Sequence, residues 1–156
     1  MSRYASRTKT ASNKSKGEIE HLLEKYGAVQ IVTATDGKQA MIMFDIGDGP
    51  QMRRVRFKLD LRVENDVAKT ATGLRRTGLA LKQAIEREQR VRWRGLLLLI
   101  KSKLVAVTEN KVVFEDEFLA YIMLPDGQTV AEKVSPLISK AYESGRMPKL
   151  LSLLPD

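Results

Sequence analysis

Four basic side chains alternate with apolar ones along a short stretch of the chain. From Val55 onward every second residue is apolar, so the residues between them point to the other side of a strand. Side chains on one strand face recur about every 6.6–6.8 Å, close to the phosphate spacing of an extended nucleic-acid strand. The stretch predicts either a cation row that follows a phosphate backbone or a solvated face that resists edge pairing. This strand row consists of Arg54, Arg56, Lys58 and Arg62.

A second basic row is predicted on a long helix. At about 100° per residue its members fall within about 60° of one another, provided that the helix extends back to Arg76. Arginine predominates, and its guanidinium binds phosphate oxygens in a bidentate way. The alternative is a solvated face in which Glu86 and Glu88 pair with Arg90 and Arg92. This helix row consists of Arg76, Gln83, Arg87, Arg90, Arg94 and Lys101.

The loop that precedes this helix could also bind an anion. Residues 70–78 combine glycines and hydroxyl side chains with Arg75 and Arg76. A helix N-terminus offers free N–H groups and the positive end of the helix dipole. The segment matches neither a P-loop nor a dinucleotide-binding fingerprint. It predicts either a further phosphate contact or an ordinary flexible loop.

The distribution of charge also favours a polyanionic partner. The 156 residues include 27 Lys and Arg against 19 Asp and Glu, a formal net charge of +8. Residues 1–103 carry 22 basic and 11 acidic side chains, whereas residues 104–156 carry 5 and 8. Binding through phosphates would fall steeply with salt and read little base sequence. DNA and RNA, as single or double strands, fit this pattern equally well.

Several kinds of site are excluded or disfavoured. The chain has no cysteine, and its single histidine, His21, lies beside Glu20 without further partners. Acidic residues between Asp45 and Asp66 could hold Mg²⁺ in principle, but none comes with a lysine at nuclease-like spacing. We therefore expect no catalytic activity, no metal and no cofactor.

The same composition indicates where the protein acts. The longest apolar run, Leu96–Ile100, is far too short to span a membrane. The N-terminus has charges but no apolar stretch behind them, so it does not resemble a secretory signal. We expect a cytoplasmic protein with no membrane contact.

The N-terminal residues divide into a basic arm and a helix. Residues 1–15 contain basic side chains and no acidic ones, and are rich in Ser, Thr and Ala, which predicts a flexible arm. Ser15 and Glu18 form a capping-box pattern, and apolar residues then recur at i, i+3, i+4 and i+7. This pattern predicts a helix over residues 16–26.

Three strands and a long helix are predicted next. An Asp-Gly pair at 36–37 between two β-prone runs indicates a hairpin, and the strand at 51–62 completes an antiparallel meander. The apolar face of the meander needs a cover, which a helix over about residues 79–107 supplies, with a start as early as Leu74 as the alternative. Because Val91 and Leu98 lie opposite the main apolar face of this helix, we expect a central core helix.

The C-terminal third predicts two to three short helices. Aromatic spacing over residues 114–122 indicates one of them. Thr129 begins a second capping box, and Pro136 marks either a fresh helix start or a kink. Gly145 ends the last helix.

These elements predict one α+β domain. The domain spans residues 16–146 and contains an N-terminal helix, a three-stranded meander, a long helix and the short C-terminal helices. Residues 147–156 form a separate tail with four leucines. Because an exposed apolar segment usually marks an interface, Leu150–Leu154 is a candidate protein-binding segment.

Two resemblances add to this interpretation. The order helix, three strands, helix over residues 16–107 resembles the double-stranded-RNA-binding domain, whose paired lysines would correspond to Arg75 and Arg76. Phage annealing proteins also place a helix on such a meander. Residues 88–104 (EQRVRWRGLLLLIKSKL) and 114–130 (FEDEFLAYIMLPDGQTV) resemble a group of small phage and prophage proteins. That resemblance implies a phage or prophage setting and no particular activity.

Two hypotheses follow. The first is a non-catalytic protein that holds a DNA or RNA backbone through the strand row, the helix row and the 70–78 loop, in phage DNA metabolism. The second is an adaptor or subunit that binds a host or phage protein through its acidic, leucine-rich C-terminal third. The pattern does not determine the oligomeric state.

Overall fold

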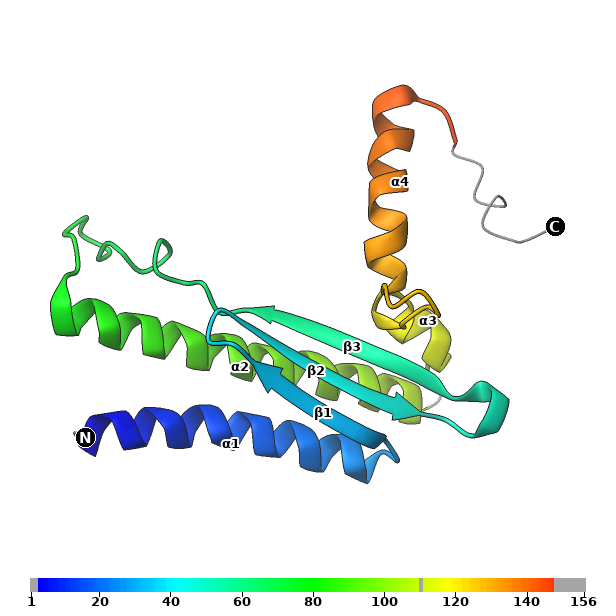
Figure 1. Ribbon diagram of the computed structural model, residues 1–156, viewed down its shortest axis with the longest axis horizontal. Coiled ribbons are helices and arrows are strands. Elements are labelled where there is room, and N and C mark those ends of the chain that lie inside the picture. The colour runs from blue at the N-terminus through cyan, green and yellow to red at the C-terminus, as the bar shows by residue number, and fades with distance from the viewer. Residues whose placement is uncertain (1–2, 110, 148–156) are drawn as a thin grey trace.

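The computed structural model describes residues 3–109 and 111–147, with side chains described from Lys14 onward. It has the α+β class that the sequence predicts, and Figure 1 shows the arrangement. The elements, in chain order, are α1 (Arg3–Lys25), β1 (Val29–Thr35), β2 (Gln39–Ile46), η1 (Gly49–Gln51), β3 (Arg53–Asp60), α2 (Gly78–Thr108), α3 (Phe114–Phe118), η2 (Leu119–Tyr121) and α4 (Val130–Ser144).

The three strands form an antiparallel sheet in the order β1-β2-β3, as the meander prediction requires. At the turn between β1 and β2, the Asp36 carboxylate accepts hydrogen bonds from the backbone N–H groups of Lys38 and Gln39, both at 2.8 Å. Gly37 has a φ of 86°, a left-handed conformation that glycine adopts without strain. The predicted Asp-Gly hairpin is therefore confirmed.

The core lies between one face of this sheet and the two long helices. Ile42 of β2 and Phe57 of β3 are register partners on the inner face, and both are buried. Ile19 of α1 and Trp93 of α2 belong to the same cluster, and Trp93 is only 2% exposed. The prediction that Trp93 is a core residue is confirmed. Burial of these large apolar side chains is the main force that holds the helices on the sheet.

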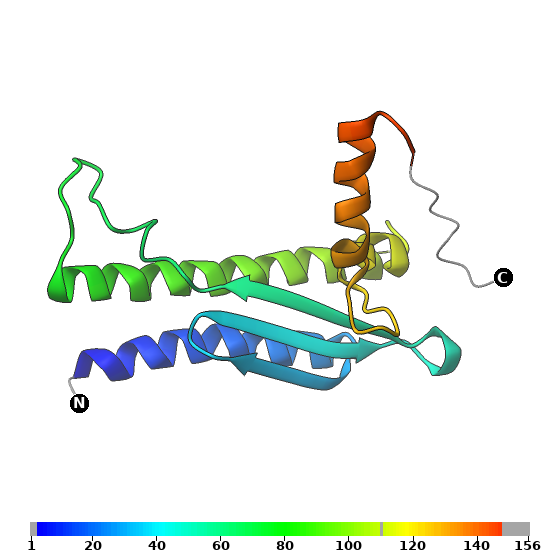
Figure 2. The same ribbon diagram turned by 45° about the horizontal axis from the view of Figure 1, so that its top comes forward.

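The N-terminal helix is longer than predicted. α1 begins at Arg3 rather than at residue 16, so the helix includes residues 3–15 of the predicted arm and Ser15 is not the N-cap. This stretch contains no proline or glycine, and its Ala, Arg and Lys residues favour a helix. Figures 1 and 2 both show α1 running beside α2, and helices in proteins gain most of their stability from such packing rather than from a local start signal.

α2 lies on the surface of the sheet and is not a central core helix. Val91 and Leu98 are 57% and 55% exposed, so the second apolar side of the helix faces solvent. The reason is that the sheet and α1 cover only one side of α2, and no further layer lies over the other side within the described residues. α2 also begins at Gly78, so Arg76 lies in the preceding loop and does not belong to the helix row.

The short elements α3 and η2 pack against β3. The Met123 N–H donates to the Arg54 carbonyl at 2.8 Å, which extends the edge of the sheet. The Tyr121 ring stacks on Phe57 with centroids 4.2 Å apart. A helix over 114–122 was predicted, and the structure divides this stretch into α3 and the 3₁₀ turn η2.

α4 starts and ends where the sequence predicts. Thr129 accepts a hydrogen bond from the Glu132 N–H, and the Glu132 side chain accepts one from the Thr129 N–H, which completes the capping box. Gly145 has a φ of 64° and ends the helix in the left-handed conformation. Pro136 lies inside α4, so it does not begin a new helix.

Candidate nucleic-acid interface

Three cations of the strand row lie on β3 and Arg62 lies beyond its end, and all four have carboxylate partners. Arg54 donates from Nε and Nη2 to the two carboxylate oxygens of Asp45, both at 2.7 Å. Arg62, two residues beyond the end of β3, donates to the oxygens of Asp60 at 3.0 and 2.8 Å. Both pairs have the bidentate geometry in which arginine also binds phosphate. A phosphate would therefore compete with a carboxylate at each of these positions.

The carboxylates in these pairs stay ionised well below neutral pH. The hydrogen bonds from Arg54 hold the pKa of Asp45 below its usual value, although burial of the Asp45 side chain opposes this effect. The hydrogen bonds from the Arg62 side chain and backbone lower the pKa of Asp60 to about 2. At neutral pH both carboxylates compensate the charge of their arginines.

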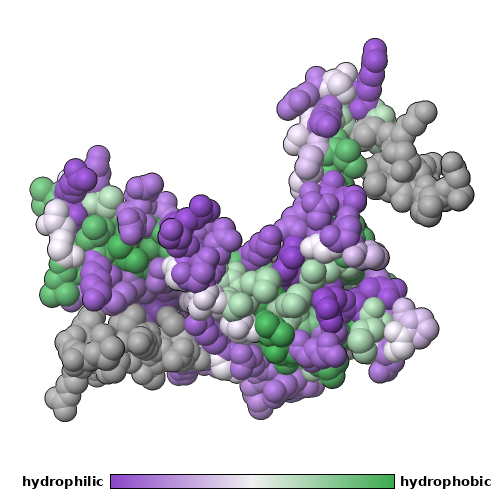
Figure 3. Space-filling model, in the orientation of Figure 1, coloured by the Kyte–Doolittle hydropathy of each residue, from purple (hydrophilic) through white to green (hydrophobic). Residues whose placement is uncertain are grey.

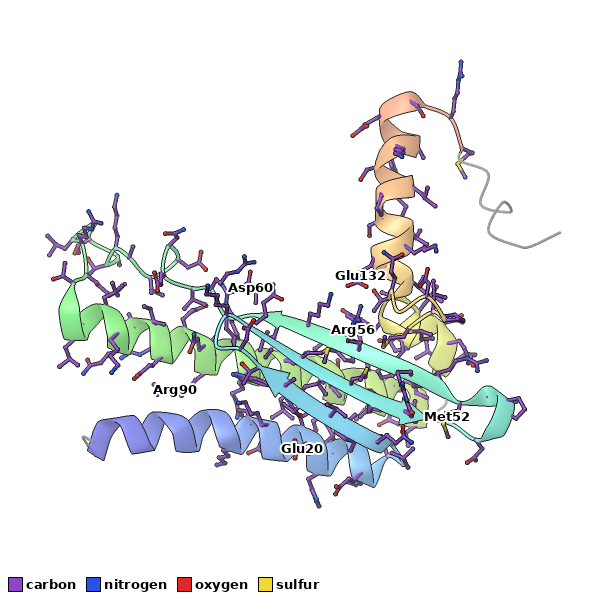
Figure 4. All side chains as sticks on the ribbon, in the orientation of Figure 1. Glu20, Met52, Arg56, Asp60, Arg90 and Glu132 are labelled. Atoms are coloured by element: carbon purple, nitrogen blue, oxygen red, sulfur yellow. The ribbon has the colours of Figure 1, made fainter. Side chains whose placement is uncertain are left out.

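Glu132 of α4 neutralises the middle of the strand row. It accepts from Arg56 Nη2 at 2.5 Å and from Lys58 Nζ at 2.6 Å. Figure 4 shows Glu132 at the base of α4 next to Arg56 on β3. The Arg56 side chain is only 13% exposed and also donates to the Gly127 carbonyl at 3.2 Å. This burial does not fit the predicted backbone-contact role of Arg56.

The outer face of the sheet, opposite the core, is apolar beside the strand row. Val32 is 45% exposed, and Met41 and Met43 are partly buried there. Figure 3 shows this face, with hydrophobic atoms in its centre and hydrophilic atoms around them. The strands supply no aromatic ring to this face, so the outer face has no platform on which bases could stack.

The two arginines of the 70–78 loop have different environments. Arg76 donates from Nη1 to the carbonyls of Val67 and Lys69, both at 2.8 Å, so its side chain stabilises the conformation of the loop. Arg75 is exposed, and no side-chain hydrogen bond or ion pair joins it to a described residue. Of the pair, only Arg75 presents its guanidinium to a ligand.

Three cations of the helix row are exposed along one side of α2, whereas Arg76 lies in the preceding loop and Gln83 and Arg90 are partly buried. Arg87, Arg94 and Lys101 are seven residues apart, so they lie nearly in line over about 21 Å of helix. All three are exposed, and within residues 3–109 and 111–147 no carboxylate pairs with them. Arg90 is partly buried at the side of α2 next to α1 (Figure 4) and also lacks an ion pair to a described residue.

Local pairing does occur on α2, but on another side of the helix. Arg92 lies 2.6 Å from the Asp66 carboxylate and 3.8 Å from that of Glu88. The alternative in which Glu88 pairs with Arg92 is therefore correct for Arg92. This ion pair does not involve Arg87, Arg94 or Lys101, the exposed cations of the helix row.

Glu132 is the site residue that the sequence interpretation missed. Its capping role was recognised, but its pairing with Arg56 joins residues 76 positions apart. No periodicity or spacing signal links two such distant residues. Only the docking of α4 on β3 brings them together.

Comparison of the chain with protein-family models, with curated proteins and with solved structures gave no match. None of the helices in the described part of the chain has the length and hydropathy to cross a membrane. Within the same residues, no group of three or more His, Asp or Glu side chains could hold a metal ion. The candidate interface therefore rests on the structure of this chain alone, in which Arg87, Arg94 and Lys101 are exposed along α2 of an α+β fold.

Proposed function

We propose that this protein binds the phosphate backbone of a nucleic acid, without catalysis, through the solvent side of α2. The observation that carries the proposal is the exposed row of Arg87, Arg94 and Lys101, for which the described residues provide no carboxylate. Like charges in a row repel one another, and a polyanion along the helix relieves this repulsion. Arg90 at the edge of the row and Arg75 in the preceding loop add further cations.

The strand row has a secondary role in this proposal. Arg54, Lys58 and Arg62 have side chains that are 48%, 55% and 63% exposed. The Arg62–Asp60 pair is exposed on both sides and contributes at most about 1 kcal/mol, so a phosphate can displace Asp60. Asp45 and Glu132 are only 7% and 33% exposed, so displacing them from Arg54 and Lys58 costs more. The loss of each ion pair offsets part of the free energy gained from the new phosphate contact. We therefore expect the helix row to supply most of the affinity.

Contacts of this kind recognise charge and backbone shape, and they carry little base-sequence information. The resemblance of residues 88–104, most of α2, to phage and prophage proteins supports a phage or prophage setting, and backbone binding in that setting would serve phage DNA metabolism. The protein would then act in the cytoplasm of the host cell.

The proposal is tested by fluorescence anisotropy with labelled single- and double-stranded DNA and RNA of one sequence, over a series of salt concentrations. The variant Arg87→Gln/Arg94→Gln/Lys101→Gln removes the centre of the helix row. Each lost phosphate contact lowers the slope of log affinity against log salt by about 0.9 for duplexes and about 0.7 for single strands. We expect the slope to fall by roughly 2–3 and the affinity at ~0.1 M salt to fall roughly 10²-fold.

A matched control removes three exposed cations elsewhere. Lys82→Gln/Lys140→Gln/Arg146→Gln changes the net charge equally, and Lys82 lies on α2 itself, about 140° around the helix from Arg87. We expect this variant to keep most of the affinity. An equal loss in both variants would show a general charge effect and overturn the α2 site. No binding of the unmodified protein to any of the four ligands at ~50 mM salt would overturn nucleic-acid binding itself.

An adaptor that binds another protein is the second candidate function. The observation in its favour is exposed apolar surface: Val91 and Leu98 on α2, and Ile138 and Tyr142 on α4. The predicted binding segment Leu150–Leu154 lies outside the described residues. Failure of all four nucleic acids to bind would favour this candidate.

A further inference from the structure

α4 has an apolar face without a cover in the described structure. The helix stands away from the sheet in Figures 1 and 2, and none of its residues is buried. Ile138 is 50% exposed and Tyr142 is 87% exposed. Figure 3 shows hydrophobic atoms along the side of this helix. A groove of about 640 Å³ follows the face, and its lining includes Val134, Leu137, Ile138, Ala141, Tyr142 and Met147.

The pattern along α4 is that of a packing face. These side chains recur at spacings of three and four residues, which gathers them on one side of the helix, whereas Ser135, Ser139 and Glu143 lie on the other. A helix of 15 residues is marginal on its own in water, since helices in proteins gain most of their stability from packing an apolar face. A surface that packs against the apolar face of α4 would therefore stabilise this helix.

We propose that the leucine-rich segment of the same chain, residues 148–156, covers this face. The described chain ends at Met147, which is itself part of the groove lining. Gly145, in the left-handed conformation, has just ended α4 and changed the direction of the chain. Four of the next nine residues are leucines, at positions 150, 151, 153 and 154.

Length and tethering both favour this occupant. From Val134 to Tyr142 the groove follows about 12 Å of helix, whereas nine extended residues reach about 30 Å. A segment joined directly to the groove has an effective concentration in the millimolar range, which a free partner of the same chemistry rarely reaches. The inference does not depend on nucleic-acid binding.

The chain contains no cysteine, so a disulfide can be introduced without other changes. Ile138→Cys combined with Leu151→Cys places one thiol in the groove and the other in the covering segment. Ser139→Cys with Leu151→Cys is the matched control, because Ser139 is the next residue and points about 100° away. A disulfide requires the two Cα atoms to approach within about 7 Å.

The full-length variants are oxidised at low protein concentration and followed by non-reducing electrophoresis and mass spectrometry. We expect an intrachain disulfide to form at least about tenfold faster in the Ile138 pair than in the Ser139 pair, since docking raises the local concentration of one thiol near the other. Equal rates would overturn the proposal. Disulfide-linked dimers would overturn it too, because they would show that a second copy of the chain covers the apolar face of α4.

Hydrogen exchange provides a test that needs no cysteine. In the full chain, Leu151→Ser/Leu154→Ser should weaken the cover while leaving α4 intact. We expect amides of residues 134–142 to exchange at least about tenfold faster, with those of residues 93–104 in α2 unchanged. Unchanged exchange over 134–142 would overturn the proposal.

Discussion

Replacing Glu132 by Gln tests whether its ion pairs hold α4 on the sheet. Glu132 is the carboxylate that both Arg56 and Lys58 contact, at 2.5 and 2.6 Å. Glutamine keeps the shape of the side chain, and it can still accept the hydrogen bond from the Thr129 N–H, because either residue completes a capping box. The substitution therefore removes the charge and preserves the start of the helix.

The size of the effect follows from the pKa of Glu132. The Lys58 ammonium, the Thr129 N–H and the Arg56 charge lower this pKa from 4.5 to about 2. That difference corresponds to at most about 3.4 kcal/mol. Because the Glu132 side chain is 33% exposed, solvent screening reduces the value, and we expect a loss of about 1–2 kcal/mol in the free energy of unfolding at pH 7. The partly buried guanidinium of Arg56, left without its counter-charge, accounts for part of this loss.

The pH dependence has a definite sign. A carboxylate whose pKa is lower in the folded chain stabilises the fold above its unfolded pKa, and this contribution disappears as the pH falls through the folded pKa. The difference between the unmodified protein and Glu132→Gln should be complete above about pH 5 and vanish between about 4.5 and 2. Urea unfolding at a series of pH values measures it.

Glu143→Gln is the control for this experiment. Glu143 is exposed on the same helix and forms no ion pair with a described residue, so we expect a change below about 0.5 kcal/mol. The reasoning would be refuted if Glu132→Gln were as stable as the unmodified protein at pH 7, or if the loss did not change between pH 7 and 2.

Three further substitutions test the fold. Gly47→Ala should lower the free energy of unfolding by about 1–3 kcal/mol, because its Cβ would lie 2.6 Å from the Gln51 carbonyl oxygen at a φ of 107°. Gly95→Ala should instead raise the free energy of unfolding by about 0.5–1 kcal/mol, because a Cβ at this position of α2 meets open space. Thermal unfolding measures both glycine variants, and shifts of the same sign in the two would contradict these predictions. Trp93→Ala should remove about 3–5 kcal/mol in urea unfolding, since this side chain is 2% exposed, whereas a loss below about 1 kcal/mol would show that Trp93 does not hold the core.

The sequence by itself determined the features that depend on near neighbours. The Asp36-Gly37 turn and the Thr129–Glu132 capping box are made by residues at most four positions apart, so the local pattern contains the whole signal. The inner face of the sheet was predictable for the same reason, because strand alternation alone places Phe57 and Val55 on one side.

Only the tertiary structure decided the length of α1, the exposure of α2 and the availability of the strand row. α1 extends to Arg3 beside α2, and Val91 is exposed because no described element covers that side of α2. The Arg56 side chain is only 13% exposed where Glu132 of α4 reaches it from 76 residues away. Each outcome depends on which surfaces meet after folding, and such contacts between distant residues leave no local periodicity in the chain.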